Sequence, residues 1–155
     1  MSSWFSIEGK TALVTGGSRG IGEMIAAGFL IHGARVYINS RKADVCDETA
    51  ARLAKTHGGD CVSVPGDMSD LGGIENVFNE IDKREERLDI LVNNAGSNVP
   101  EEIDEITDEN WDRIIELNLS SCMALTRELV PQMKERGWGR VIHISSIMGL
   151  VSKEG

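Results

Sequence analysis

The sequence predicts a doubly wound α/β fold, in which about five parallel strands form a sheet with helices on both faces. Short apolar runs alternate with longer segments of helical periodicity from end to end, which is the pattern of βαβ units. No internal repeat, low-complexity tract or linker divides the chain. With 155 residues, 41% of them hydrophobic, the chain can bury about 70% of its unfolded surface without disulfides or a structural metal. We therefore expect one domain spanning residues 1–155.

Each predicted strand is a short apolar run bounded by polar residues or glycine. The runs are 11–14, 35–38, 61–64, 88–92 and 140–144. Because a helical segment follows each of the first four, we expect the strands to run parallel, with their carboxyl ends at one edge of the sheet. In open α/β sheets that edge holds the ligand, so the residues that follow each strand are candidates for a site.

The spacing of apolar residues predicts the connecting helices. Apolar residues at every fourth position from Ile21 predict a first helix that ends at Gly33, and a second helix spans about 43–56. Asp70 is expected to cap a third helix, and the charged run 82–87 is interpreted as its solvated end. The apolar face of this third helix is formed by Ile74, Val77, Phe78 and Ile81.

A fourth helix is expected to start near Thr107, whose hydroxyl can cap it. Its apolar face is formed by Trp111, Ile114, Ile115 and Leu117. A fifth helix runs from about 120 to 136, where Pro131 is expected to bend it or mark a boundary. The acidic residues within 101–112 are interpreted as charges that favour a helix start rather than as a metal site, so we expect no bound metal.

Composition excludes several classes of protein. The 25 acidic residues outnumber the 16 Lys and Arg, and the net charge of −9 argues against a surface for nucleic acid or anionic lipid. No apolar stretch has the length of a membrane span and the first residues do not resemble a signal peptide, so we expect a cytoplasmic protein that does not enter a membrane. Cys46, Cys61 and Cys122 form no Cys-x-x-Cys pair and are interpreted as reduced thiols.

The strongest local signal is the glycine-rich turn between the first strand and the first helix, Thr15-Gly16-Gly17-Ser18-Arg19-Gly20-Ile21-Gly22. Glycines there allow a tight turn and a close approach to a diphosphate, whose charge the helix N-terminus attracts. The spacing Gly-x-x-x-Gly-x-Gly departs from the usual Gly-x-Gly-x-x-Gly. The turn predicts a Rossmann-like dinucleotide site, and a glycine turn without a ligand is the alternative.

The residues after the second strand indicate which dinucleotide fits. The sequence there is Asn39-Ser40-Arg41-Lys42, with no acid to accept the ribose 2′-hydroxyl of NAD. Arg41 and Arg19 can instead clamp the extra phosphate of NADP, because a guanidinium matches phosphate oxygens in geometry. We therefore favour NADP over NAD. The alternative is that Arg41 and Lys42 are only a solvated turn.

Polar residues and a glycine also follow the later strands. Asp67, after the third strand, can accept a hydrogen bond from the adenine amino group, and Gly96, after the fourth, can let the ribose approach. Taken singly, each also fits a helix cap or a turn. Ser145 and Ser146 follow the fifth strand, but His143 has no well-placed acid partner, so a Ser–His–Asp hydrolase is poorly supported.

Four motifs together resemble the classical short-chain dehydrogenase/reductase family. They are Thr15-Gly-x-x-x-Gly-x-Gly22, Asn93-Asn-Ala-Gly96, Asn118 within Leu117-Asn118-Leu119, and Ile144-Ser-Ser146. The resemblance runs from about Ile7 to the last residue. The Ser18-Arg19 turn and Arg41 are similar to the NADP-preferring members, among them the 3-oxoacyl-[acyl-carrier-protein] reductases.

The resemblance implies a role for each matching residue. The residues implied on the diphosphate side are Gly16, Ser18, Arg19, Gly20, Ile21 and Gly22, with Arg41 on the 2′-phosphate. Asp67 and Met68 are implied at adenine, whereas Asn94, Ala95 and Gly96 are implied to line the ribose and support the central strand. On the substrate side, Ser146 would bond the carbonyl or alcohol oxygen, and Asn118 would anchor a water leading to the active-site lysine. The implied reaction is hydride transfer between NADPH and a small-molecule carbonyl or alcohol, in a homo-dimer or homo-tetramer.

The family's Tyr-x-x-x-Lys motif begins about a dozen residues beyond the serine. Nine residues follow Ser146 here, the only tyrosine is Tyr37, and Lys153 has no matching tyrosine before it. We therefore expect the N-terminal portion of an NADP-dependent reductase, a Rossmann domain incomplete at its C-terminus, inactive alone and prone to associate through its fifth strand. A catalytically inactive nucleotide-binding or regulatory module is the alternative, and another Rossmann protein such as a methyltransferase is poorly supported.

Overall fold

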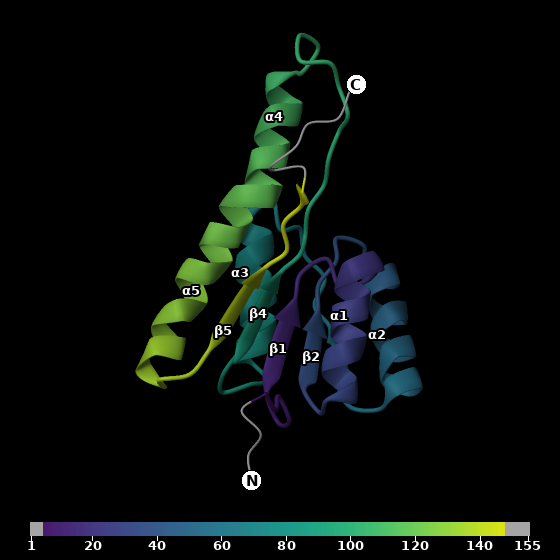
Figure 1. Ribbon diagram of the computed structural model, residues 1–155, viewed down its shortest axis with the longest axis vertical. Coiled ribbons are helices and arrows are strands. Elements are labelled where there is room, and N and C mark those ends of the chain that lie inside the picture. Colours follow the sequence, from purple (N-terminus) through teal and green to yellow (C-terminus); the bar gives the residue numbers. More distant parts are fainter. Residues whose placement is uncertain (1–4, 148–155) are drawn as a thin grey trace.

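Five parallel strands form the centre of the molecule in the computed structural model, which describes residues 5–147 (Figure 1). The sheet has the order β3-β2-β1-β4-β5. Its strands are β1 (Thr11–Val14), β2 (Arg35–Ile38), β3 (Cys61–Ser63), β4 (Ile90–Asn93) and β5 (Arg140–His143). Because the order reverses beside β1, the sheet has a switch point between β1 and β4, where doubly wound proteins bind ligands. The predicted fold class is confirmed.

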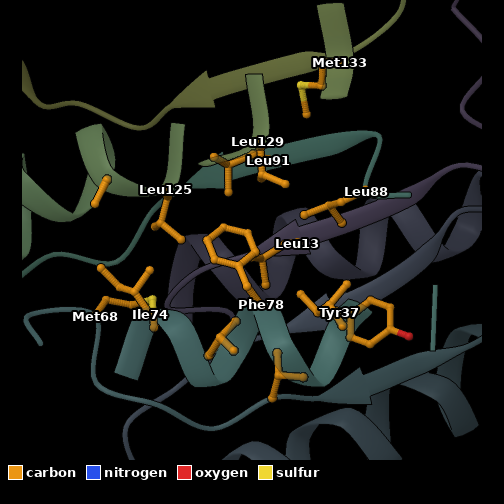
Figure 2. Packing of buried hydrophobic residues seen from close by; sticks show 14 of the residues in the cluster. Leu13, Tyr37, Met68, Ile74, Phe78, Leu88, Leu91, Leu125, Leu129 and Met133 are labelled. Atoms are coloured by element: carbon orange, nitrogen blue, oxygen red, sulfur yellow. The ribbon is translucent and has the colours of Figure 1, made fainter. Parts of the chain in front are cut away.

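Helices cover both faces of the sheet, as predicted. The helices α1 (Gly20–Ile31) and α2 (Ala43–His57) pack on one face, and α3 (Leu71–Asp82) and α5 (Ser121–Glu135) pack on the other (Figure 1). Side chains alternate along β1. Ala12 and Val14 pack into a first core, beneath α1 and α2, while Leu13 packs into a second core, beneath α3 and α5. Figure 2 shows Phe78 of α3 among the leucines of the second core. The sheet therefore separates two hydrophobic cores.

The predicted boundaries are accurate to within about two residues. The strand β4 begins at Ile90 instead of residue 88, and α1 ends at Ile31, with Gly33 in a turn that requires a φ of +80°. Both predicted caps are present. The Asp70 carboxylate accepts a hydrogen bond from the Gly73 N–H at 3.0 Å, and the Thr107 hydroxyl caps α4 (Asp108–Ile115).

The two helices predicted after residue 107 are both present, but a helical turn joins them. The helix α4, the π-helical turn η1 (Glu116–Ser120) and α5 follow one another without a break, and Pro131 lies inside α5. In this turn the Ser121 N–H bonds to the carbonyl of Glu116, five residues back. The helix α4 extends beyond the carboxyl edge of the sheet (Figure 1), so Trp111 is 57% exposed rather than part of the core.

The charged run 82–87 is exposed as expected except at Glu85, which binds to the amino edge of the sheet. The buried Tyr37 hydroxyl donates to Glu85 Oε1 at 2.6 Å, and Arg35 donates to the same oxygen at 2.7 Å. Arg35 also pairs with Asp60 at 2.5 Å. This network joins β2, the start of β3 and the segment after α3.

None of the helices within residues 5–147 is both long and apolar enough to cross a membrane. The cysteines Cys46, Cys61 and Cys122 are all free thiols, as expected for reduced cysteines. Burial raises the pKa of the Cys61 thiol to about 12, so this side chain behaves as a packing group rather than as a nucleophile.

The Tyr37–Glu85 hydrogen bond predicts a loss of stability in alkali. Burial, and then the bond to Glu85, raise the pKa of Tyr37 from 10.0 to about 12. Because the folded pKa lies above the ordinary value, this stabilisation is complete below pH 10.0 and is lost as the pH rises towards 12. We expect Tyr37→Phe to lower the free energy of unfolding at neutral pH by about 1–2 kcal/mol and to flatten its decline in alkali.

Urea unfolding at a series of pH values measures the free energy, and tyrosinate absorbance measures the pKa directly because Tyr37 is the only tyrosine. The matched control is Phe5→Leu, which changes an exposed ring. A wild-type titration at the ordinary tyrosine pKa would contradict the prediction.

Candidate functional site

The candidate site lies at the carboxyl edge of the sheet, where four turns meet. The glycine-rich turn 15–22 follows β1, and the turn 39–42 follows β2. The turn 64–70 follows β3, and the loop 94–97 follows β4. Since these four strands are neighbours in one parallel sheet, their turns lie side by side. The structure therefore brings together the four segments that hold the sequence-predicted cofactor residues.

The glycine-rich turn is packed on one side and open on the other. Gly16 and Gly20 have φ angles of +64° and +55°, which favour glycine. A Cβ atom at Gly22 would collide with the Gly16 carbonyl and the Asn94 amide, whereas one at Gly20 would meet nothing within 4 Å. Gly20 is the first residue of α1, and at a helix N-terminus the free N–H groups and the helix dipole attract negative charge.

The buried hydroxyl of Thr15 joins the glycine-rich turn to the loop after β4. It donates to the Val92 carbonyl at 3.2 Å and accepts from the N–H groups of Asn94 and Ala95, each at 3.0 Å. In return, the Asn94 amide donates to the Thr15 carbonyl at 2.9 Å. Sequence reasoning assigned no role to Thr15, although a hydroxyl at the end of a buried strand is a signal for such a bond.

Arg41 and Asp67 lie close enough to interact electrostatically. The Asp67 carboxylate accepts from the N–H and the hydroxyl of Ser69, at 3.0 and 2.8 Å. Burial raises the pKa of Asp67, but the Ser69 bonds and the charge of Arg41 outweigh it, so the pKa is lowered overall. Asp67 is therefore ionised at neutral pH. The Met68 side chain is 2% exposed and packs in the core, so only its backbone can meet a ligand.

Asn118 lies in the π-helical turn and supports the loop after β4. Its amide donates to the Ser97 carbonyl at 2.8 Å, and its oxygen accepts from the Ser97 N–H at 2.9 Å. The Asn118 carbonyl accepts from the thiol of Cys122 at 3.4 Å. Directly after β5, the Ile144 N–H bonds to the carbonyl of Asn93, the last residue of β4, at 2.9 Å. Ser146, two residues further, is exposed.

Within residues 5–147 no three His, Cys, Asp or Glu side chains lie together in a way that could hold a metal ion. The site is instead a polar edge with two exposed arginines, Arg19 and Arg41. Such an edge can bind a phosphorylated ligand but carries no metal-ligand cluster in this part of the chain.

Residues 10–155 match the family described as short chain dehydrogenase. The chain belongs to this family. It is 40% identical over 154 residues to the rhamnolipids biosynthesis 3-oxoacyl-[acyl-carrier-protein] reductase of Pseudomonas aeruginosa, a match that covers 97% of this chain and 59% of that protein. It is 39% identical over 144 residues to the D-beta-hydroxybutyrate dehydrogenase of Rhizobium meliloti, covering 92% and 56%. The resemblance seen in the sequence motifs is confirmed.

Solved structures of short-chain dehydrogenases have the same fold. The Pseudomonas aeruginosa RhlG/NADP active-site complex matches with a TM-score of 0.89 and 38% identity, over 100% of this chain and 61% of that one. L-sorbose reductase from Gluconobacter frateurii, solved with NADPH and L-sorbose, matches with a TM-score of 0.89 and 38% identity, over 94% and 55%. The chain thus spans less than two thirds of the length of these relatives.

We expect Thr15→Val to destabilise the protein, because two N–H groups of the loop after β4 lose their acceptor while the shape of the side chain is kept. The free energy of unfolding should fall by about 2–3 kcal/mol. Thr15→Ser is the matched control, since it keeps the hydroxyl and should cost less than about 1 kcal/mol. Urea unfolding measures both variants, and equal losses in the two would show that the hydroxyl is not what holds this loop.

Proposed function

We propose that this chain is the cofactor-binding portion of an NADP-dependent short-chain oxidoreductase. The observation that carries the proposal is the carboxyl edge itself, where an open glycine-rich turn at a helix N-terminus neighbours the turn 39–42, which holds Arg41 and no acid. The reaction would transfer hydride between NADPH and a small-molecule carbonyl or alcohol. The two solved relatives described above were determined with NADP or NADPH, which supports this cofactor.

The residues at this edge fit a dinucleotide. The backbone from Gly16 to Gly22 would hold the diphosphate on the open side of Gly20, with Ser18 and Ile21 in the turn and Arg19 beside it. The loop after β4, Asn94, Ala95 and Gly96, would line the nicotinamide-side ribose. Bound NADPH would supply the hydride, while the chain's own residues bind and orient it.

At the adenine end, Arg41 would bind the 2′-phosphate and Asp67 would accept a hydrogen bond from the adenine amino group. The lowered pKa of Asp67 supports this role, because an ionised carboxylate only accepts. The backbone of Met68 would form the other side of the adenine site. An NAD enzyme would instead need an acid to bind the free ribose hydroxyls, and this chain has Asn39 and Ser40 after β2.

On the substrate side, Ser146 would hydrogen-bond the reacting oxygen and the Asn118 carbonyl would hold a water. The bond of the Asn118 side chain to Ser97 fixes its place. The similarity to a 3-oxoacyl-[acyl-carrier-protein] reductase supports a 3-oxoacyl thioester as the substrate of the whole protein, which we propose to be a homo-dimer or homo-tetramer.

A catalytically inactive nucleotide-binding module is the second candidate. It is favoured by the position of the only tyrosine, Tyr37, whose hydroxyl is bound to Glu85 at the opposite edge of the sheet. Both candidates predict that the 155-residue chain binds NADPH without turnover in an NADPH-oxidation assay with a 3-oxoacyl thioester, because its only tyrosine is Tyr37. Turnover well above a no-enzyme control would contradict the second candidate, and would also show that the chain does not need the Tyr-x-x-x-Lys motif.

We expect Arg41→Ala to weaken the binding of NADPH by about tenfold to a hundredfold, because a charged hydrogen bond to the phosphate is lost. Binding of NADH, which has no 2′-phosphate, should change by less than about twofold. Fluorescence titration of each nucleotide measures both dissociation constants. Lys42→Ala, which removes the neighbouring exposed cation, is the matched control and should leave NADPH binding almost unchanged.

Two results would contradict the proposal. Failure of the wild-type chain to bind NADPH would remove the cofactor assignment. Equal weakening of NADPH and NADH by Arg41→Ala would show that Arg41 does not bind the 2′-phosphate.

A further inference from the structure

Asn39 occupies the junction of the turns that form the adenine end of the site. It follows β2 directly, and its side chain is only 2% exposed. We propose that Asn39 is a positioning residue that determines cofactor specificity, because it holds the segment leading to Arg41 against the turn that carries Asp67. The proposal rests on the proposed NADP-binding function.

The backbone of Asn39 ties this segment to β1 and the glycine-rich turn. Its N–H donates to the Val14 carbonyl at 3.0 Å, and its carbonyl accepts from the Gly17 N–H at 2.9 Å. Gly17 is tightly packed there, since a Cβ atom on it would lie 2.9 Å from Ile38. The start of the glycine-rich turn and the end of β2 are therefore one packed unit.

The side chain of Asn39 ties the same segment to the turn after β3. Its amide nitrogen donates to the carbonyls of Val64 and Gly66, at 3.0 and 3.1 Å. The Gly66 N–H donates back to the Ser40 carbonyl at 3.1 Å. This buried position needs two donor hydrogens on a short side chain, which asparagine has and aspartate lacks. A carboxylate would face two carbonyl oxygens without a hydrogen between them.

These bonds fix where Arg41 lies relative to Asp67. Arg41 follows Ser40, and Asp67 follows Gly66, so each is one residue from the Ser40–Gly66 bond. The two charges interact, since Arg41 helps to lower the pKa of Asp67. Without the Asn39 amide, the turn after β3 loses two of its bonds to β2. The distance between the charges of Arg41 and Asp67 then changes, so the 2′-phosphate is attracted less strongly.

The ratio of the dissociation constants for NADH and NADPH separates positioning from stability. A variant that is partly unfolded has a smaller binding-competent fraction, which weakens both nucleotides by the same factor. The ratio is therefore unchanged by a purely structural defect. A displaced Arg41 lowers the ratio, because only NADPH carries the 2′-phosphate.

The test measures this ratio by fluorescence titration of the 155-residue chain and its variants. We expect Asn39→Ala and Asn39→Ser to lower the ratio by at least about fivefold. Asn39→Asp should lower it further, because it adds a negative charge beside the phosphate. The control is Tyr37→Phe, which changes a residue of β2 by removing its hydrogen bond to Glu85 and should leave the ratio within about twofold of wild type.

Each outcome decides between the proposals. A wild-type preference for NADPH that Asn39→Ala and Asn39→Ser retain would overturn the role of Asn39 and leave the proposed function standing. A wild-type chain with no preference would overturn the proposed function itself. If no Asn39 variant unfolds cooperatively while Tyr37→Phe does, Asn39 is a purely structural residue and the inference is overturned.

Discussion

The hydroxyl of Thr15 is the contact on which the carboxyl edge depends. Where parallel strands end, their last N–H and carbonyl groups lose the partners that the sheet provides, and a buried edge must replace them. Thr15 does so for the two residues that begin the loop after β4. This loop in turn places the Asn94 amide against the glycine-rich turn, which is why Gly22 has no room for a side chain.

The two edges of the sheet are held by different kinds of interaction. At the carboxyl edge the bonds that join one turn to the next come from neutral groups, a hydroxyl and the amides of Asn39, Asn94 and Asn118. At the amino edge they come from charges, with Arg35 between Asp60 and Glu85. Salt therefore weakens the connections at the amino edge more than those at the carboxyl edge.

Sequence reasoning was strongest where the deciding interactions are local. The alternation of apolar periods predicted the sheet, and Asp70 and Thr107 cap their helices through residues three positions away. Sequence reasoning failed where the interacting residue is distant in sequence, or where backbone hydrogen bonding determines how two helices are joined. Glu85 meets Tyr37 across 48 positions of sequence, and no local pattern marks that pair. The π-helical turn keeps apolar residues near their helical spacing, so the continuity of α4 with α5 left no trace in the periodicity.

The loop after β4 is short, and its two ends are anchored to different segments, the glycine-rich turn and the π-helical turn. Its first residues are fixed by Thr15, and Ser97 is fixed by Asn118 across the π-helical turn. The loop therefore connects the glycine-rich turn to the π-helical turn through a side-chain hydrogen bond at each end, so a displacement of one turn strains the other.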